Sequence, residues 1–337
     1  MKAYLYCDKR SLNDATNFYV GMIKESLNNL GYIFIICHKI QDIKSADLII
    51  TITDTFFFKA KLFYPFKKTI YWAQGVSADE AKMNGISGVK NFIRYIFHIL
   101  AEFLSVRTCS MLLSVSDRMN LYFKEKYGYN SNHNVIVPCF NMKLSEMFNL
   151  EQYSKPSFVY AGSASVWQCV DIMLDVYEQI EKQISHATIT ILSADKSSFE
   201  EKIRMREIKN YEIKYVPQYL LNEELHKYKY GFLLRENHIV NNVATPTKMN
   251  SYLSNFIIPI YSNAVDDFCK NISLEKFSLI MSCPLSVDSI TDKIITFERN
   301  TQNFKDYKNI VEKIFYTHYN RLFYIGIITK KIQEIGL

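Results

Sequence analysis

The sequence predicts an α/β protein with two domains, each built around a parallel β-sheet. Short apolar runs, typical of strands that are buried on both faces, alternate with amphipathic stretches along the chain. This alternation stops once, between residues 141 and 156, and then begins again. The length of 337 residues also exceeds one ordinary hydrophobic core. These observations predict two α/β domains in tandem, and we expect a cleft between them.

The N-terminal half predicts a complete parallel sheet. Its apolar runs predict six strands, at residues 2–7, 32–37, 47–51, 69–72, 111–115 and 134–137. Residues 16–30 have helical spacing and are followed by Gly31, where a left-handed residue commonly ends a helix. Ser116 opens a second helix that ends near Gly128. Residues 1–145 therefore form the N-terminal domain.

The C-terminal half repeats this organisation. The predicted strands are residues 157–161, 187–192, 212–216, 231–234, 257–261 and 278–281. The predicted helices between them are residues 167–184, 199–208, 223–229 and 246–253, and residues 286–337 are largely helical. We assign residues 156–317 to the C-terminal domain. We expect residues 318–337 to form a helix that packs back on the N-terminal domain.

Charge and cysteine content narrow the function class and the compartment. A net charge of +6 is too small for a dedicated nucleic-acid binder, and it suits phosphorylated ligands or an anionic membrane. The seven cysteines include no C-x-x-C pair, so no zinc site is predicted and we interpret them as reduced, buried thiols. The N-terminus enters a strand directly, and no apolar run is long enough to span a bilayer. We expect a cytoplasmic protein.

Ligands of open parallel sheets bind at the carboxyl ends of the strands. The loop after the strand at 157–161 contains Gly162 and Ser163. Small residues let the backbone approach a phosphate, and free N–H groups at a helix start favour an anion. The alternative is a tight turn between strand and helix, since the dinucleotide and P-loop glycine patterns are absent.

A second loop, after the strand at 231–234, carries two cations. Arg235 ends the strand, and Lys248 lies in the first turn of the following helix. Two cations around a helix start suit a diphosphate, and His238 lies in the polar loop between them. The alternative is a surface pair of Arg235 with Glu236 and a solvated Lys248.

Two loops of the N-terminal half are candidates for the cleft or an acceptor site. The segment after the strand at 69–72 contains Gln74, Gly75 and Glu80. The helix dipole also explains an acidic residue near this helix start. Asn17 lies in the first turn of the first helix, where Asp14 or Thr16 alternatively serves only as a cap.

Residues 89–107 form a strongly apolar helix with basic residues around it, namely Lys82, Lys90, Arg94 and Arg107. Such a helix lies in a membrane surface or packs on its own sheet. Its His98 has apolar neighbours in the sequence, and we interpret it as a core residue.

Several short motifs carry a resemblance to a known family. They are Trp72-x-Gln74-Gly75 with Glu80, Val115-Ser116-x-x-Met119, Lys126-Tyr127-Gly128, Tyr160-x-Gly162-Ser163, Arg235, Pro246-Thr247-Lys248-Met249-x-Ser251-Tyr252-Leu253 and Ile258-Pro259-Ile260. Together they cover nearly the whole chain and resemble family 4 of the GT-B glycosyltransferases, above all the bacterial capsule and O-antigen enzymes.

The resemblance implies a GT-B fold of two Rossmann-like domains, with the nucleotide-sugar donor in the second and the acceptor in the first. It implies transfer of a sugar to a lipid-linked surface glycan with retention, without a metal or other cofactor, because the nucleotide sugar is a co-substrate. Gly162 and Ser163 would line the donor diphosphate, with Thr247 beside them. Arg235 and Lys248 would act as the catalytic cations that stabilise the leaving group.

The chain departs from the family at specific positions. The family's two glutamates, eight residues apart, fall at Val243 and Ser251. Ser251 then takes the ribose position, and Asn241 or Asn242 can substitute as hydrogen-bonding groups. Phe256 stands where a glycine is common. The missing acids leave two alternatives to the transferase, a catalytically silent scaffold of a glycan-assembly complex and a nucleotide-sugar epimerase.

Overall fold

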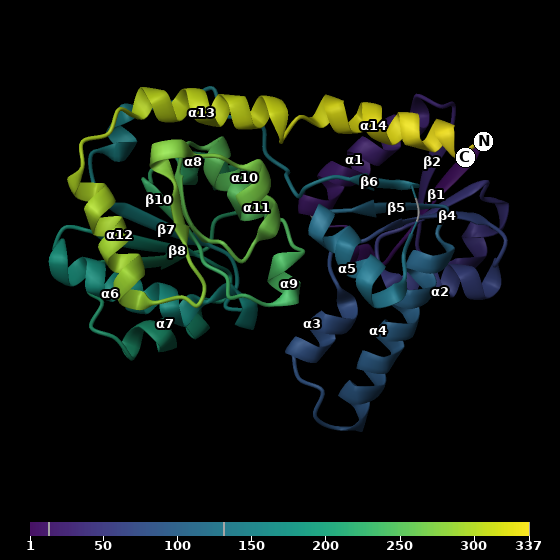
Figure 1. Ribbon diagram of the computed structural model, residues 1–337, viewed down its shortest axis with the longest axis horizontal. Coiled ribbons are helices and arrows are strands. Elements are labelled where there is room, and N and C mark those ends of the chain that lie inside the picture. The colour runs from purple at the N-terminus through teal and green to yellow at the C-terminus, as the bar shows by residue number, and fades with distance from the viewer. Residues whose placement is uncertain (13, 131, 337) are drawn as a thin grey trace. The chain divides into compact units, whose positions relative to one another are not determined.

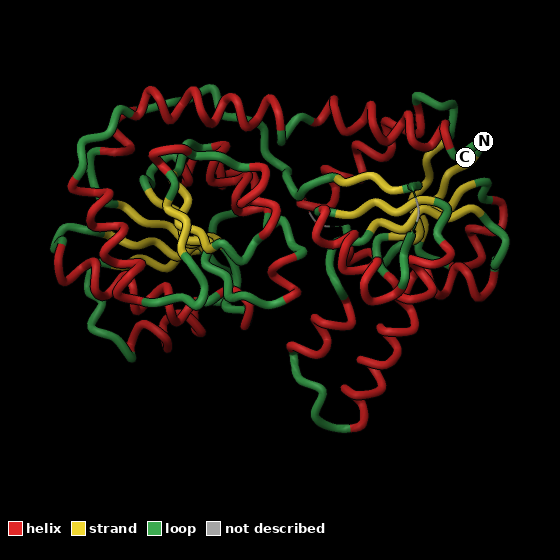
Figure 2. Tube along the Cα trace, viewed as in Figure 1, coloured by secondary structure: helices red, strands yellow, loops and turns green. Residues whose placement is uncertain are grey.

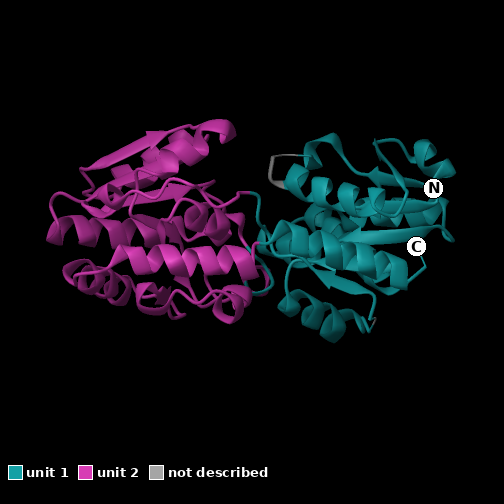
Figure 3. Ribbon diagram, turned by 90° about the horizontal axis from the view of Figure 1, so that it is seen from above, with its two compact units in different colours: residues 1–141, 242–245, 320–337 teal, residues 142–241, 246–319 magenta. Residues whose placement is uncertain are grey.

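The computed structural model describes residues 1–12, 14–130 and 132–336, without the side chains of residues 14 and 15. It divides into two compact units (Figure 3). Unit 1 comprises residues 1–141, 242–245 and 320–337, and unit 2 comprises residues 142–241 and 246–319. Each unit has its own sheet and core.

The described part of unit 1 contains a six-stranded parallel sheet with the order β2-β1-β3-β4-β5-β6 (Figure 1). Its strands are β1 (Lys2–Tyr6), β2 (Ile33–Cys37), β3 (Leu48–Thr51), β4 (Lys68–Trp72), β5 (Met111–Ser114) and β6 (Asn134–Ile136). In β1, Leu5 pairs with Ile36 of β2 on one side and with Ile50 of β3 on the other. All six predicted strands are confirmed, and the residues of β3 and β5 are buried throughout, whereas β2 exposes Ile33 and Ile36.

The helices of unit 1 begin and end at residues with the expected chemistry. They are α1 (Asp14–Asn28), α2 (Asp54–Phe63), α3 (Ser77–Met83), α4 (Val89–Thr108), α5 (Asp117–Tyr127) and α14 (Arg321–Glu334), with the short 3-10 turns η1 (Lys9–Ser11) and η2 (Ile40–Ser45). The Ser116 hydroxyl accepts a hydrogen bond from the Met119 N–H at the start of α5, and Gly128 ends that helix with a φ of +66°. Gly31 follows α1 with a φ of +77°. Both helix ends are as predicted.

Helix α14, near the C-terminus of the chain, packs against α1 within unit 1 (Figure 1). The Ser26 hydroxyl lies within hydrogen-bonding distance of the Met22 and Ile325 carbonyls, at 2.9 and 3.3 Å. Arg321 binds Glu25 at 2.6 Å. Residues almost 300 positions apart thus share one helix–helix contact.

The described residues of unit 2 also form a six-stranded parallel sheet, with the order β12-β11-β10-β7-β8-β9 (Figure 2). Its strands are β7 (Ser157–Ala161), β8 (Thr188–Leu192), β9 (Tyr211–Lys214), β10 (Tyr230–Leu233), β11 (Ile258–Ser262) and β12 (Leu279–Met281). Aromatic rings fill the space beside the central strands, where Phe158 stacks on Tyr230 at 4.9 Å and on Phe232 at 5.6 Å. The two parallel sheets confirm the predicted fold class.

The helices associated with this sheet are α6 (Val170–Gln183), α7 (Lys196–Arg204), α8 (Leu221–Leu225), α9 (Ile239–Asn242), α10 (Thr247–Ser254), α11 (Asp266–Asn271), α12 (Val287–Arg299) and α13 (Phe304–Thr317). The predicted helix start at residue 167 is wrong. Cys169 adopts a φ of +50°, which a right-handed helix cannot contain, so a 3-10 turn (η4, Val166–Gln168) precedes α6. The helix predicted at 199–208 likewise ends early, at Arg204.

The segment without periodicity, residues 141–156, is held to unit 2 by buried amides. Asn250 accepts a hydrogen bond from the Met142 N–H and donates one to the Met142 carbonyl. Gln152, in the turn η3 (Leu150–Tyr153), donates to the Tyr228 and Asn255 carbonyls. Side-chain amides replace the backbone ladder here, because these residues belong to neither sheet.

The sequence also carried expectations about the cysteines and about membrane-spanning helices. None of the seven cysteines forms a disulfide, but only Cys7 and Cys37 are buried and Cys269 is exposed. The interpretation of all seven as buried thiols is therefore wrong. Within the described residues, no helix combines the length and the apolar character needed to cross a bilayer.

Candidate functional site

The strand β7 of unit 2 ends in a glycine loop. Gly162 has a φ of +152°, and its N–H donates to the Leu192 carbonyl at 3.0 Å. The next residue, Ser163, accepts a hydrogen bond from the Tyr160 hydroxyl through its carbonyl. Its own hydroxyl lies 2.8 Å from that of Ser165. These contacts fix the loop from both ends at the carboxyl edge of the sheet.

Lys248 reaches this loop from the first turn of α10. A Cβ added to Gly162 would lie 2.7 Å from Nζ of Lys248, so the missing side chain makes room for the ammonium group. Nζ donates to Oε1 of Gln168 at 2.6 Å and lies 4.1 Å from the centre of the Tyr160 ring. The alternative interpretation of Lys248 as a solvated residue is therefore wrong.

Arg235 contacts the turn η4, which follows the same loop, and is only 5% exposed. Its Nη1 donates to the Trp167 carbonyl at 2.6 Å, and its Nε is buried without a partner. No carboxylate pairs with Arg235 or with Lys248 among the described residues. The alternative pair with Glu236 is thus not formed.

The charge of Arg235 acts on Lys248. Burial lowers the pKa of Arg235 and of Lys248, and the charge of Arg235 lowers the pKa of Lys248 further. Buried charges normally have a partner of opposite sign, because desolvation is costly. A buried and a partly buried cation that lack a carboxylate among the described residues, beside a glycine that admits close approach, are therefore suited to an anionic ligand.

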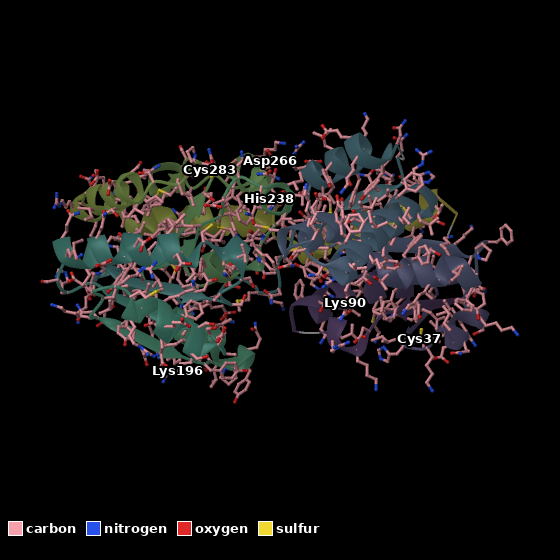
Figure 4. The ribbon with its side chains drawn as sticks, turned by 90° about the horizontal axis from the view of Figure 1, so that it is seen from below. Cys37, Lys90, Lys196, His238, Asp266 and Cys283 are labelled. Carbon is pink, nitrogen blue, oxygen red and sulfur yellow. The ribbon has the colours of Figure 1, made fainter. Side chains whose placement is uncertain are left out.

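The polar loop between the cations is held by hydrogen bonds between its own side chains and backbone. Nδ1 of His238 accepts from the Val240 N–H at 3.3 Å, and the Asn241 amide donates to the Glu236 carbonyl at 2.9 Å. Figure 4 labels His238 on this unit. Asn241 is 2% exposed, whereas Asn242 belongs to unit 1. His238 and Asn241 shape the loop, and the contacts assign Asn242 elsewhere.

Helix α10 also carries Thr247 and Ser251. The Ser251 hydroxyl donates to the Thr247 carbonyl at 3.1 Å, one turn back in the same helix. Ser251 is 9% exposed, and Thr247 is partly buried beside Lys248. In this conformation the Ser251 hydroxyl is used in a hydrogen bond within α10.

The predicted residues of unit 1 lie on two elements. The Glu80 carboxylate covers Gly75, since a Cβ there would lie 2.1 Å from Oε1 of Glu80. Burial raises the pKa of Glu80. Gln74 is exposed at the end of β4, and Asn17 is exposed on α1. The Thr16 hydroxyl donates to the Ser11 carbonyl, whereas the proposed cap Asp14 has its side chain outside the described residues.

A cavity in unit 1 joins the predicted Glu80 to residues that sequence reasoning did not identify. The cavity, of about 430 Å³, lies at the starts of α2 and α3, and its walls include Asp54, Glu80 and His98. Nδ1 of His98 lies 2.7 Å from the Asp54 carboxylate. His98 is therefore a polar, paired residue, and its interpretation as a core residue is wrong. The available signal was the polar pair Thr53-Asp54, which follows the predicted strand at 47–51 after Ile52.

The comparisons with known proteins concern the fold. No protein-family model matches the chain, and no curated protein matches its sequence. Solved structures do match. HepE of Anabaena, in complex with UDP-glucose, has a TM-score of 0.73 at 8% identity, with 98% of this chain and 99% of that chain covered. WaaG, a glycosyltransferase involved in lipopolysaccharide biosynthesis, has a TM-score of 0.69 at 11% identity, with 98% and 100% covered.

TarM of S. aureus, crystallised with UDP, has a TM-score of 0.63 at 10% identity. The alignment covers 88% of this chain but only 57% of TarM, so the present chain spans little more than half of that protein. At these identities the similarity concerns the fold. The two parallel-sheet units and these neighbours together show that the chain has the GT-B fold.

Proposed function

We propose that the protein is a glycosyltransferase that moves a sugar from a nucleotide-sugar donor to a surface-polysaccharide acceptor. The observation that carries this proposal is the pair of a buried Arg235 and a partly buried Lys248 beside the Gly162 loop, neither of which pairs with a carboxylate among the described residues. A diphosphate supplies the anionic charge that such a pair lacks. Solved structures of the same fold contain UDP or UDP-glucose, which supports a nucleoside diphosphate as the ligand.

The same residues suit the chemistry of transfer. As the bond between the sugar and the diphosphate breaks, negative charge grows on the leaving phosphate oxygen, and fixed cations stabilise that charge. We propose that Arg235 and Lys248 provide this stabilisation without a metal or other cofactor. We also propose that transfer proceeds with retention, as the family resemblance implies. Gly162 and Ser163 would supply backbone contacts to the diphosphate.

The acceptor in this proposal is a lipid-linked glycan at the inner face of the cytoplasmic membrane. Helix α4 presents six exposed apolar side chains, here called the α4 apolar face: Val89, Phe92, Ile93, Ile96, Leu100 and Phe103. Lys82, Lys90 (labelled in Figure 4) and Arg94 are exposed near it. Apolar side chains flanked by cations suit a surface of anionic lipid. WaaG, of similar fold, acts in lipopolysaccharide biosynthesis.

Calorimetric titration with UDP, ADP and GDP tests the donor site. We expect at least one nucleotide to bind, and we expect Arg235→Ala and Lys248→Ala each to weaken that binding about 10- to 100-fold, since a charge-assisted hydrogen bond contributes about 1.5–3 kcal/mol. Lys276→Ala, which removes an exposed cation of the same unit, is the matched control. Binding that ignores both site variants, or no binding at all, contradicts the proposal.

One observation favours a second candidate, a catalytically silent protein of the same fold. Val243 and Ser251 occupy the positions of the two glutamates that the resemblance expects. Val243 is buried and its carbonyl accepts a hydrogen bond from Ser116, while Ser251 bonds within α10. Neither supplies a carboxylate to a donor ribose. Incubation with radiolabelled UDP-sugars and a membrane extract separates the candidates, because only the enzyme transfers label to lipid.

A further inference from the structure

The turn η4 (Val166–Gln168) belongs to unit 2 and lies between β7 and α6, both of which are labelled in Figure 1. None of its three residues is buried, and Val166 is 71% exposed. Its backbone hydrogen bond is local and runs from the Gln168 N–H to the Ser165 carbonyl at 2.9 Å. The hydrophobic core of unit 2 therefore does not fix this turn, and its position depends on polar contacts.

Both cations of the candidate donor site hold this turn. Nη1 of Arg235 donates to the Trp167 carbonyl at 2.6 Å, and Nζ of Lys248 donates to Oε1 of Gln168, also at 2.6 Å. These two acceptors are neutral oxygens, so they provide hydrogen bonds without balancing the charge of the cations. A phosphate oxygen provides a hydrogen bond and negative charge together, and it is the stronger acceptor for a cation.

The other groups around the cations belong to the sheet and its loop. Nζ of Lys248 lies 2.7 Å from the position of a Cβ on Gly162 and 4.1 Å from the centre of the Tyr160 ring. Tyr160 is 1% exposed within β7, so its ring is held by the core. Arg235 is only 5% exposed and must be uncovered before a diphosphate can contact it. Because η4 has no buried residue, it is the covering element that moves at the lowest cost.

The residue after the turn has a strained backbone. Cys169 adopts a φ of +50° and a ψ of +38°, a left-handed conformation that is unfavourable for a residue with a Cβ. Such a conformation persists only where the surrounding contacts impose it. The hydrogen bonds of η4 to Arg235 and Lys248 are contacts of this kind. When a ligand takes over both cations, residue 169 can return to an ordinary conformation, and this relief of strain favours movement of the turn.

We propose that η4 is a lid on the donor cations, held shut by the Trp167 carbonyl and the Gln168 amide oxygen, and that a diphosphate displaces both oxygens and moves the turn outward. The inference rests on the proposed function and adds an internal competitor to the donor site. Gln168 therefore opposes donor binding, whereas a residue that merely positioned Lys248 would assist it. The sign of the effect of Gln168 on nucleotide affinity separates these two roles.

The two tryptophans of the chain make movement of η4 measurable. Trp72 is 3% exposed in unit 1, whereas Trp167 is part of the turn itself. Acrylamide quenching of tryptophan fluorescence is measured on the full chain alone, with whichever of UDP, ADP and GDP binds most tightly, and with inorganic pyrophosphate at saturation. Pyrophosphate has no base that could stack on the indole ring. We expect both ligands to raise the quenching constant, and Trp167→Phe to lose this rise while it still binds the nucleotide.

Calorimetric titration with the same nucleotide tests Gln168. Gln168→Ala removes the competing acceptor, and we expect the nucleotide to bind about three- to tenfold more tightly, the range of one hydrogen bond. Gln168→Glu places a carboxylate beside Lys248 and should weaken binding at least tenfold. Gln179→Ala is the matched control, because Gln179 of α6 bonds Asp288 instead of a donor cation, and its affinity should equal that of the wild type.

Either of two results overturns the inference. The first is a quenching constant that does not rise with both ligands, or a rise that persists in Trp167→Phe and so comes from Trp72. The second is equal or weaker nucleotide affinity in Gln168→Ala. If binding still depends on Arg235 and Lys248, only the lid is disproved, whereas a chain that binds no nucleotide loses the proposed donor site as well. The quenching measurement uses the unaltered chain, so it stays decisive if a variant fails to fold.

Discussion

The ammonium group of Lys248 occupies the space that a side chain on Gly162 would need. Nζ lies 2.7 Å and Cε 2.8 Å from the position of a Cβ on that glycine. The glycine and the lysine are 86 positions apart in the sequence. A side chain on residue 162 would collide with Lys248 in its present position. The missing Cβ lets a partly buried cation lie directly against a backbone loop.

The first prediction follows from this contact. Gly162→Ala places a methyl group against Lys248 and imposes a φ of +152° that alanine rarely adopts. We expect UDP binding to weaken at least tenfold, measured by calorimetric titration. Gly21→Ala in α1 has open space around its Cβ and should instead stabilise the protein by about 1 kcal/mol. Normal UDP affinity in Gly162→Ala would contradict the proposed donor site.

The second prediction concerns the α4 apolar face. The double variant Ile93→Glu/Leu100→Glu adds two charges to a surface that holds exposed apolar residues. We expect the wild type to sediment with vesicles that contain 30% phosphatidylglycerol, and the variant to remain in the supernatant. Added salt should reduce wild-type binding, because each cation near anionic lipid contributes about 1 kcal/mol.

Leu322→Glu is the control for this measurement. Leu322 is an equally exposed apolar residue of unit 1, but it lies on α14 rather than on α4. The Leu322→Glu variant should sediment with vesicles like the wild type. If the double variant sediments with vesicles as the wild type does, the α4 apolar face does not bind the membrane.

The third prediction is a pH dependence of stability. Glu102 is fully buried and accepts hydrogen bonds from the Ala78 N–H and the Tyr127 hydroxyl. Burial raises its pKa from 4.5 to about 7. The folded state therefore holds a proton that the unfolded state has released, so this group loses stabilising free energy as the pH rises from about 4.5 through 7.

Glu102→Gln removes this proton exchange and keeps the shape of the side chain. We expect the difference in unfolding free energy between wild type and variant to change by about 2–3 kcal/mol between pH 5 and pH 8. Urea denaturation at four pH values measures it. A constant difference across this range would mean that Glu102 is already ionised in the folded protein at pH 5.

The fourth prediction concerns Phe256, which stands where the resembling family commonly has glycine. It adopts a φ of +55° and is 1% exposed, with its ring 5.0 Å from that of Phe148. The ring contacts thus outweigh a left-handed backbone that costs about 1–2 kcal/mol. We expect both Phe256→Gly and Phe256→Ala to destabilise the protein, and Gly to be about 1 kcal/mol less harmful. Chemical denaturation of the three proteins checks the order.

Local patterns predicted the strands, several helix ends and the loop that carries Arg235. Apolar runs identified all twelve strands, and the glycines at 31 and 128 marked the ends of α1 and α5. These features depend on residues within a few positions of each other, so their sequence spacing is sufficient. Because the strands are parallel, the pattern also predicted that the loops at Gly162 and Arg235 share one edge of the sheet.

The tertiary structure alone decided which distant residues meet. It paired His98 with Asp54, 44 positions away, and placed residues 242–245 in unit 1. Periodicity records which face of an element is buried but not which element covers it. That choice depends on strand order and on the packing of helices from separate parts of the chain.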